Sequence, residues 1–345
     1  MILASRVSGR VTPMPFKAVR LNAETYPVEP DERLELERAG AELIAVEGLS
    51  ADSISDCDAL LVVSAYVPGS MIERMTRCRV ISRLGAGTDR IGVEAATQRG
   101  IVVANVPDFC ENEQAEHALA LLLAFARRLP SMTAAMRRGE WTARGHPGVH
   151  RIAGRTLGLI GFGASARGVA VRARPFGLRL IAWARSAEKH RHEAERLGVE
   201  LVELDELLAR SDFVSIHLPL TAETKHLLDA TKLARMKPTA TLINTARGAI
   251  IDEGALVAAL QQGQLGGAAL DVFEGIDVFA LPGTPSDHPL LKLDNVILTP
   301  HCAGSSVESS YDSKVRGARH VAAVLSGRWP AFVVNRGVTP RWPLS

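Results

Sequence analysis

Short apolar runs alternate with helical patterns over almost the whole of this 345-residue chain, and this alternation restricts its fold more than any other feature. It is typical of βαβ units, in which a helix connects two parallel strands. The runs are continuously apolar, as expected of strands that helices cover on both faces. The chain is also longer than most single-core proteins. We therefore predict an α/β protein with two doubly wound domains.

Two series of strands are predicted, separated by a long helix. The first series comprises Lys17–Leu21, Glu42–Val46, Ala59–Val63, Val80–Leu84 and Ile101–Val106, with helical segments at Pro30–Ala39 and Gly69–Arg77. The second series comprises Thr156–Gly161, Arg179–Ala184, Phe213–Leu218, Thr241–Thr245, Gly267–Phe273 and Val296–Thr299, followed by a helix at Ser306–Leu325. The separating helix, about Asn112 to Leu129, is apolar on nearly every side, so we expect it to pack between domains or subunits. We expect Arg137–Arg151 to form a connecting loop.

Composition excludes several classes of function. The formal net charge of +2 is too small to indicate binding to nucleic acid or to an anionic membrane. The four cysteines are scattered without a C-x-x-C pair, which favours a reduced intracellular protein without a zinc site. The first residues lack a signal-peptide pattern, and the most apolar stretch, His117 to Ala126, is too short to cross a bilayer. We expect a soluble, cytoplasmic protein.

A glycine-rich turn follows the first strand of the second series. Gly161, Gly163 and Ala166 occupy the positions of a G-x-G-x-x-A pattern, and Ala164 and Ser165 open the helix that follows. The first glycine permits a tight turn, the second lets the backbone approach a pyrophosphate, and the alanine permits close helix–strand packing. The helix N-terminus offers free N–H groups and a partial positive charge. Because the pattern lies between a strand and a helix, it predicts a dinucleotide site.

The end of the next strand bears on which dinucleotide is bound. NAD requires an acidic side chain there to hold the adenosine ribose, but this chain has Ala184, followed by Arg185 and Ser186. An arginine and a hydroxyl can hold a 2′-phosphate, so we predict a preference for NADP(H), with NAD(H) possible. The alternative is that Arg185 is a solvated loop residue and that the protein uses either cofactor.

From these residues onward the chain resembles the D-2-hydroxyacid dehydrogenase family, which includes phosphoglycerate dehydrogenase, glyoxylate/hydroxypyruvate reductases and the C-terminal binding proteins. The resemblance covers about Val80 to Gly304. It rests on the glycine turn and on the segments GAGTD, QAEHALALLL, SIHLPLTAETKHLL, MKPTATLINTARG, AALDVFE and NVILTPH, in this order.

The resemblance implies a domain organisation and an assembly. Residues 1–107 and 305–345 are expected to form a flavodoxin-like substrate domain, into which a Rossmann-like cofactor domain, residues 108–304, is inserted. The long helix is expected to carry a homodimer interface. The expected function is hydride transfer between NAD(P)H and a small 2-keto or 2-hydroxy acid.

Two residues are expected to carry the chemistry. Arg247 follows a strand at its carboxyl end, where ligands bind in open α/β sheets, and could grip the carboxylate of a 2-keto acid. An arginine with a structural ion pair is the alternative. His301 also follows a strand and matches the family's general acid/base, which gives a proton to the keto oxygen as hydride arrives at carbon.

The remaining expected site residues fall into two groups. The turn Gly85-Ala86-Gly87 can offer N–H groups to the substrate carboxylate. Tyr66 is expected to overhang the same pocket, although a packing role is a close alternative. The resemblance implies a second group that surrounds the nicotinamide and the rest of the cofactor: His217, Pro219, Thr245, Ala246, Asp271 (which would hold the carboxamide) and Gly304.

The chain departs from the family pattern at Ile276, where family members carry a glutamate that pairs with the catalytic histidine. Three interpretations stay open: Asp277 replaces it, Glu274 or Asp287 replaces it, or nothing does. Without the glutamate, we expect the pKa of His301 to lie near its ordinary value of about 6.5, or lower if the ring is buried. We therefore predict that 2-keto acid reduction is fastest on the acidic side of neutrality.

This departure also supports a rival function. Ile276, and the similarity of the segment NVPDFC to the C-terminal binding proteins, favour a cofactor-sensing binding protein or co-repressor with little turnover. The joint presence of Arg247 and His301 argues against it.

Overall fold

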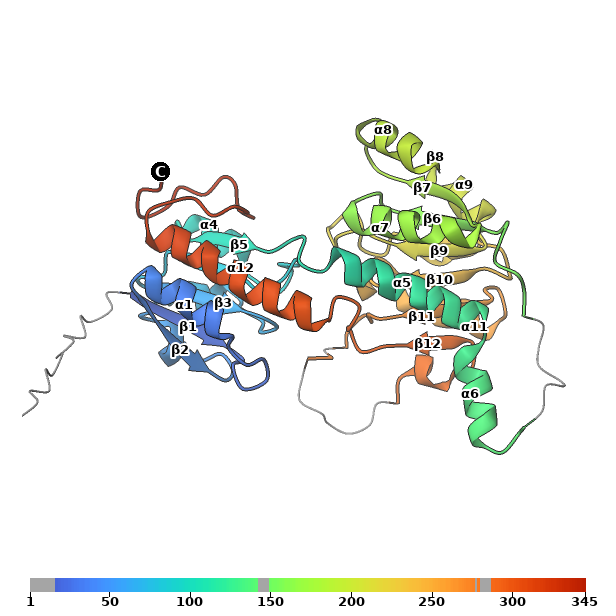
Figure 1. Ribbon diagram of the computed structural model, residues 1–345, viewed down its shortest axis with the longest axis horizontal. Helices are drawn as coiled ribbons and strands as arrows, with labels where there is room; N and C mark the ends of the chain where they lie inside the picture. Colours follow the sequence, from blue (N-terminus) through green and yellow to red (C-terminus); the bar gives the residue numbers. More distant parts are fainter. Residues whose placement is uncertain (1–15, 142–148, 277, 280–286) are drawn as a thin grey trace, which may run out of the picture. The chain divides into compact units, whose positions relative to one another are not determined.

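The computed structural model describes residues 16–141, 149–276, 278–279 and 287–345. These residues form two compact units (Figure 1). Unit 1 comprises residues up to 109 together with Val307–Ser345, and unit 2 comprises Cys110–Ser306. Both are built on parallel sheets, which confirms the α/β prediction. Each boundary between the two units lies two residues after the predicted domain boundary, at 109/110 in place of 107/108 and at 306/307 in place of 304/305.

Unit 1 contains a five-stranded sheet in the order β2-β1-β3-β4-β5, and every pair of neighbours is parallel. Its strands are β1 (Phe16–Leu21), β2 (Ala41–Val46), β3 (Ala59–Val62), β4 (Val80–Arg83) and β5 (Val102–Asn105). All five were predicted, with ends that differ by at most one residue.

Helices cover both faces of the unit 1 sheet, which explains its continuously apolar strands. Successive residues of a strand point to opposite faces, so Val19 joins the core beneath one set of helices and Ala18 joins the core beneath the other. The helices are α1 (Pro30–Arg38), α2 (Ala51–Ile54), α3 (Gly69–Ile72), α4 (Val93–Gln98) and α12 (Val307–Leu325). The predicted helical segment Gly69–Arg77 is therefore helical only in its first turn.

Unit 2 contains a seven-stranded parallel sheet in the order β12-β11-β10-β9-β6-β7-β8. The strands are β6 (Thr156–Ile160), β7 (Arg179–Trp183), β8 (Val199–Leu201), β9 (Phe213–Ile216), β10 (Thr241–Asn244), β11 (Gly267–Leu270) and β12 (Val296–Leu298). The edge strand β8 was not predicted. The order changes direction at β6, which has β7 on one side and β9 on the other, and such a switch point is where ligands bind in open α/β sheets.

Helices also cover both faces of the unit 2 sheet (Figure 1). They are α5 (Glu111–Ala126), α6 (Leu129–Arg137), α7 (Ala164–Ala173), α8 (Ala187–Leu197), α9 (Leu204–Arg210), α10 (Ala230–Leu233) and α11 (Glu253–Gln261), with short 3₁₀ turns at Arg174–Phe176, Gly248–Ile250 and Pro289–Lys292.

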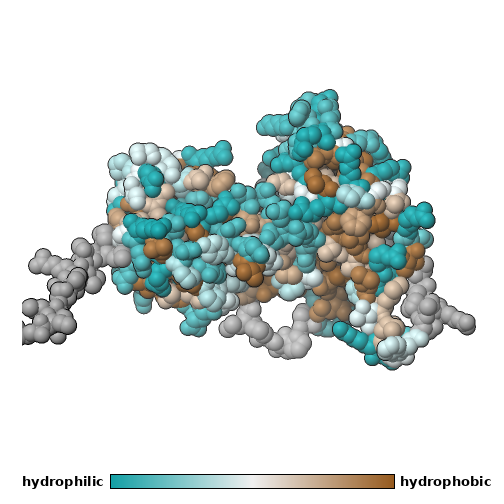
Figure 2. All heavy atoms as spheres, viewed as in Figure 1, coloured by the Kyte–Doolittle hydropathy of each residue, from teal (hydrophilic) through white to brown (hydrophobic). Residues whose placement is uncertain are grey.

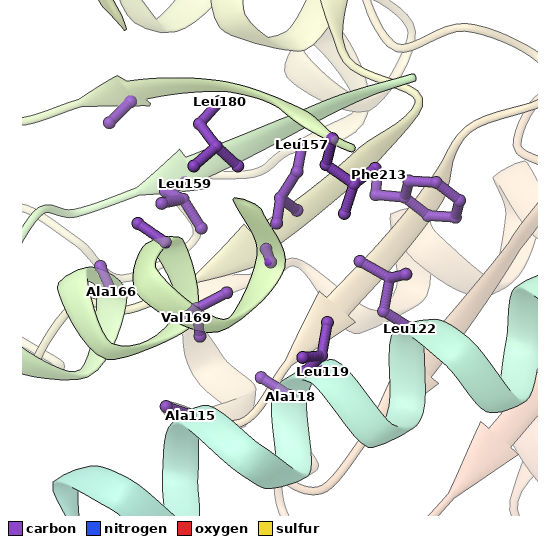
Figure 3. Packing of buried hydrophobic residues seen from close by; sticks show 14 of the residues in the cluster. Ala115, Ala118, Leu119, Leu122, Leu157, Leu159, Ala166, Val169, Leu180 and Phe213 are labelled. Atoms are coloured by element: carbon purple, nitrogen blue, oxygen red, sulfur yellow. The ribbon is translucent and has the colours of Figure 1, made fainter. Parts of the chain in front are cut away.

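The long apolar helix α5 packs against α7 and the sheet of unit 2 (Figure 3). Ala115 and Ala118 face α7, and a Cβ added at Gly168 of α7 would lie 3.0 Å from the Cβ of Ala115. Small residues on both helices therefore permit a close crossing. Leu119 and Leu122 point toward the core residues of β6 and β9.

The prediction of one helix from Asn112 to Leu129 was wrong at its C-terminal end. The chain turns at Arg128, whose φ is 53°, and α6 then occupies a stretch that the sequence analysis left without a helix. In the described part of the chain no single helix has the length and apolarity to span a bilayer, and α5 and α6 meet the criteria only as a pair bent by 59°. Figure 2 shows apolar side chains gathered over the region of α5.

Candidate active site

The sequence-predicted site residues of unit 2 lie at one edge of its sheet. Because the strands are parallel, their carboxyl ends meet at the same edge, and each strand from β12 to β7 delivers predicted residues there. In the order of the sheet these are His301, Asp271, Arg247, His217, Gly161 and Arg185. Adjacent strands lie about 4.8 Å apart, so the turns that follow β10 and β12 are separated by roughly 10 Å.

The glycine turn after β6 has the geometry of a phosphate-binding turn. Gly161 has a φ of 94°, and a Cβ there would lie 2.4 Å from the carbonyl oxygen of His217, so only glycine fits. Gly163 precedes α7, and a Cβ there would meet no atom of the described part of the chain within 4 Å. The first turn of α7, which contains Ala164 and Ser165, carries no acidic side chain. These residues fit the pyrophosphate of a dinucleotide.

His217 links this turn to β9. Its Nδ1 lies 3.0 Å from Oγ of Ser165, and its Nε2 lies 2.9 Å from Oγ of Ser215. Burial lowers the pKa of His217 to about 4, so the imidazole is neutral at pH 7. The sequence analysis missed Ser215, although Ser215 and His217 are two residues apart at the end of a strand and were therefore expected on one face. Pro219 follows and is exposed.

The end of β7 carries the residues expected to select the cofactor. Arg185 and Ser186 are exposed, and Ser186 precedes α8 without a capping hydrogen bond from its side chain. Glu223 lies within electrostatic range of Arg185. The Thr221 hydroxyl donates to Oε2 of Glu223 at 2.7 Å and lowers the pKa of that carboxyl. The charge of Arg185 lowers the same pKa to a smaller extent. The sequence analysis did not anticipate Glu223.

The turn after β10 positions Arg247. Asn244, fully buried at the end of the strand, donates from Nδ2 to the carbonyl oxygen of Arg247 at 2.9 Å. Its Oδ1 accepts from the backbone N–H of Ala246 at 3.0 Å. Thr245 is buried, whereas Ala246 and Arg247 are half-buried. Asn244 was not among the predicted residues. A buried asparagine at the end of a strand needs hydrogen-bond partners, however, and so indicates that its amide holds the backbone of the following turn.

Asp271 lies directly after β11 and is fully buried, and its carboxylate accepts several hydrogen bonds. Its Oδ1 accepts from the Thr299 hydroxyl at 2.5 Å and from the Cys302 N–H at 3.0 Å, and its Oδ2 accepts from the Ala303 N–H at 2.8 Å. Side-chain ligand atoms of His117, Asp271 and Cys302 all lie within 4.8 Å of one another. The Thr299 hydroxyl is hydrogen-bonded to both His117 and Asp271, so this cluster is a hydrogen-bonded network.

His301 follows β12 in a left-handed backbone conformation, with a φ of 54°. Its N–H donates to the carbonyl oxygen of Asp271 at 2.8 Å. Its ring lies against Phe279, with the ring centroids 4.9 Å apart. Gly304, three residues on, is half-buried.

The carboxylates considered as replacements for the family glutamate have other partners. Oε1 of Glu274 lies 2.7 Å from Nε2 of His226, and Oδ1 of Asp287 lies 2.7 Å from Nζ of Lys292. Ile276 is 38% exposed. Asp277 lies outside the described residues.

In unit 1 the predicted substrate residues follow neighbouring strands. The turn Gly85-Ala86-Gly87 comes after β4, and Asn105, at the end of β5, donates from Nδ2 to the Ala86 carbonyl at 2.7 Å. Arg83 donates to the carbonyl oxygen of Gly87 at 3.1 Å. Tyr66, in the segment after β3, is 60% exposed and therefore has no core-packing role. The sequence analysis missed Arg83 and Asn105.

A doubly wound parallel sheet with a glycine turn at its switch point defines a dinucleotide-binding protein. A family model described as "D-isomer specific 2-hydroxyacid dehydrogenase, NAD binding domain" matches residues 119–303. The chain belongs to this family, as the sequence analysis predicted.

Individual relatives agree. The chain is 40% identical over 291 residues to a glyoxylate reductase of Korarchaeum cryptofilum, covering 83% of this chain and 85% of the relative. It is 40% identical over 323 residues to a D-3-phosphoglycerate dehydrogenase of Methanocaldococcus jannaschii, covering 92% of this chain but only 60% of that relative. A crystal structure of the D-lactate dehydrogenase of Aquifex aeolicus, complexed with NAD and lactic acid, superimposes with a TM-score of 0.82 at 26% identity, over 90% of this chain and 96% of that one.

Proposed function

We propose that this chain is an oxidoreductase of CH–OH donors that transfers a hydride between NAD(P)H and a small 2-keto or 2-hydroxy acid. One observation carries the proposal. Arg247, Asp271, His301 and the glycine turn lie at a single sheet edge, in an order set by the parallel strands. An anion-binding turn, a fixed cation and a titratable imidazole are the groups that this reaction needs.

The residues of unit 2 have separate roles in this mechanism. The open space beside Gly163 and the N-terminus of α7 hold the pyrophosphate. Thr245, Ala246 and the segment from His217 to Pro219 flank the nicotinamide, with Asp271 and Gly304 close to them. The nicotinamide, when bound, supplies or accepts the hydride.

Arg247 binds the substrate carboxylate and polarises the neighbouring carbonyl. His301 donates a ring N–H proton to the keto oxygen in reduction and takes it back in oxidation.

Unit 1 is proposed to bind substrate through the N–H groups of the turn Gly85-Ala86-Gly87, with Tyr66 beside it. Exposure of Tyr66, at 60%, supports a ligand-facing role over a packing role. Specificity for the side chain of the substrate then lies in this unit. Comparing the kcat/KM of Tyr66→Phe with that of Tyr66→Ala separates the loss of the hydroxyl from the loss of the ring.

For the cofactor we propose a preference for NADPH. Ala184 removes the carboxylate that would repel a 2′-phosphate, and exposed Arg185 and Ser186 are available to bind it. Glu223 opposes this preference, because its charge acts on Arg185. We expect Glu223→Gln to increase the ratio of kcat/KM for NADPH over NADH, and Arg185→Gln to decrease it.

We also propose that the protein is a homodimer, assembled through the region of α5 and α6. Leu129 is 53% exposed, and Trp141, after α6, is 78% exposed. Large apolar side chains exposed together indicate a protein–protein surface. Light scattering of wild type and Trp141→Glu tests this, and a monomeric wild type would contradict it.

The experiment that tests the activity is NADPH and NADH oxidation against glyoxylate, hydroxypyruvate, pyruvate and bulkier 2-keto acids. We expect Arg247→Gln to lower kcat/KM by about 10- to 100-fold, since a charge-assisted hydrogen bond contributes about 1.5–3 kcal/mol. We expect His301→Gln to lower kcat by about 10²–10⁴-fold. His192→Gln, on the exposed surface of α8, is the control.

The second candidate, a cofactor-sensing binding protein, is favoured by the partners of the two described carboxylates. Glu274 is paired with His226 and Asp287 with Lys292. Tight binding of NAD(P)H without turnover on any of these keto acids would support it and contradict the enzyme proposal.

A further inference from the structure

The backbone at His301 has a conformation that needs support. Its φ of 54° is left-handed, a region that residues with a Cβ rarely adopt. Such strain persists only where the surrounding structure holds it. The conformation sets the direction in which the imidazole leaves the chain, so whatever holds this backbone also aims the ring.

Asp271 holds three successive N–H groups of this turn. Its carbonyl oxygen accepts from His301 at 2.8 Å, and its carboxylate accepts from Cys302 at 3.0 Å and from Ala303 at 2.8 Å. Two successive N–H groups, those of Cys302 and Ala303, thus converge on one anion and form a nest directly after the left-handed residue. The Asp271 carboxylate therefore holds the two residues that follow His301, while the backbone carbonyl of Asp271 holds the His301 N–H.

A directed hydrogen-bond chain holds the carboxylate in turn. A carboxylate can only accept, so the Thr299 hydroxyl donates its proton to Asp271, at 2.5 Å. The hydroxyl oxygen then accepts from Nε2 of His117, 3.0 Å away. His117 therefore carries a proton on Nε2. The same nitrogen lies 3.6 Å from Oδ1 of Asp271.

His117 comes from α5, 182 residues away from Thr299 in the sequence. The buried residues of α5 are apolar, Ala115, Ala118, Leu119, Leu121 and Leu122. His117 thus brings a hydrogen-bond donor from α5 to the network around the fully buried Asp271.

We propose that His117 is a positioning residue for His301, acting through Thr299 and the Asp271 carboxylate. This inference rests on the proposed role of His301 as general acid/base. His117 orders the acceptor that fixes the left-handed turn, and so fixes the imidazole relative to the substrate. A displacement of the imidazole by about 1 Å is enough to slow a proton transfer that depends on geometry.

The test compares His117→Leu, which removes the donor, with His117→Gln, whose amide nitrogen replaces Nε2. We expect His117→Leu to lower kcat for keto acid reduction about 10-fold or more and to change the pH dependence of kcat/KM. The Kd of NAD(P)H should change less than about twofold. His117→Gln should restore most of the rate. Glu116→Gln, an exposed neighbour on α5, is the matched control and should behave as wild type.

Variants of Thr299 provide a second, independent test of the proposal. Thr299→Val should reproduce His117→Leu, and Thr299→Ser should be near wild type. Because the two residues act in one chain, the double variant His117→Leu/Thr299→Val should be no slower than either single variant. A merely structural histidine would lower the melting temperature of His117→Leu and leave kcat and the pH profile unchanged, which would overturn the proposal.

A readout without turnover separates this inference from the proposed function. NMR titration of the His301 ring follows its protonation directly. A shifted titration or broadened His301 signal in His117→Leu supports the positioning role even if no keto acid is reduced. An unchanged His301 titration rejects the positioning role even in an active enzyme.

Discussion

Glu274 is hydrogen-bonded to His226, with Oε1 and Nε2 2.7 Å apart, so its carboxylate is engaged by a histidine other than His301. Both side chains are partly exposed, at 40% for the histidine and 31% for the glutamate. Such pairs contribute little to stability. The pair fastens the segment after β11 to the segment after β9.

The first prediction follows from this pair. Glu274→Gln keeps a side chain that can bond to His226, so we expect kcat/KM for keto acid reduction to change less than about twofold, with an unchanged pH profile. Steady-state rates between about pH 5 and 9 measure this. A lost or displaced pH-dependent limb would mean that Glu274 serves His301 after all.

Ile276 allows the family carboxylate to be restored. It is 38% exposed, so a polar replacement is tolerated. If position 276 reaches His301 as the family pattern implies, Ile276→Glu raises the pKa of the imidazole, because a nearby anion favours its charged form. The proton donor then persists to higher pH, and we expect reduction at about pH 8.5 to be roughly 3- to 10-fold faster than in wild type. Ile276→Gln is the uncharged control, and identical profiles for Glu and Gln would contradict the prediction.

The two glycines of the turn after β6 should respond differently to alanine. Gly161→Ala places a Cβ 2.4 Å from the His217 carbonyl at a φ of 94°, so we expect a loss of stability of about 1–3 kcal/mol. The methyl group of Gly163→Ala would meet no atom of the described residues within 4 Å, so we expect a normal melting temperature. We expect a raised Kd for NAD(P)H, because the methyl group occupies the space proposed for the pyrophosphate. Thermal unfolding and fluorescence titration separate the two effects. Unchanged cofactor binding in Gly163→Ala would place the phosphates elsewhere.

Hydrophobic pattern was sufficient to predict five strands of unit 1 and six of unit 2. The predicted strands often ran past the observed ends, as at Phe273 against Leu270, because apolar residues continue into the turns that carry the site. The missed strand β8 has three residues at a sheet edge, too few to show a pattern. The missed helix α6 begins after a left-handed arginine, Arg128, where no glycine marks the break.

Strand-end positions were also sufficient to place the principal site residues at one sheet edge. The contacts of those residues were not predictable, because they join distant parts of the chain. His117 and Thr299 are 182 residues apart, and no local pattern pairs them. The partners of Glu274 and Asp287 likewise depend on how the segment after β11 folds, which periodicity does not describe.

Arg83 should affect substrate binding without touching substrate. Its guanidinium donates to the carbonyl oxygens of Gly87 at 3.1 Å, Leu84 at 2.8 Å and Val62 at 3.4 Å, and so supports the turn Gly85-Ala86-Gly87. We expect Arg83→Gln to raise KM for the keto acid about 10-fold or more, while the Kd of the cofactor is unchanged, because the turn loses its fixed shape. The exposed Arg74→Gln is the control. An unchanged KM would remove this turn from substrate binding.

His320 should make unit 1 sensitive to acid. It is 5% exposed on α12, and its Nδ1 has no hydrogen-bond partner among the residues that the structure describes. Burial, aided by Arg316 and opposed by Asp108, lowers its pKa to about 4. Its pKa in the unfolded chain is about 6.5, so between these values the unfolded state binds the proton more tightly. Its contribution to stability is therefore complete above about pH 6.5 and declines as the pH falls toward 4.

The full decline corresponds to at most about 3 kcal/mol. We expect His320→Leu to flatten the dependence of the urea unfolding midpoint on pH between about 4.5 and 7, while His192→Gln, which removes an exposed histidine, leaves the slope as in wild type. His217, whose pKa is also lowered to about 4, contributes a decline of the same sign in unit 2. The measurement therefore follows the unfolding of unit 1, with a probe such as a fluorophore attached to that unit. A slope equal to that of wild type in His320→Leu would mean that the buried imidazole takes up its proton without unfolding the unit.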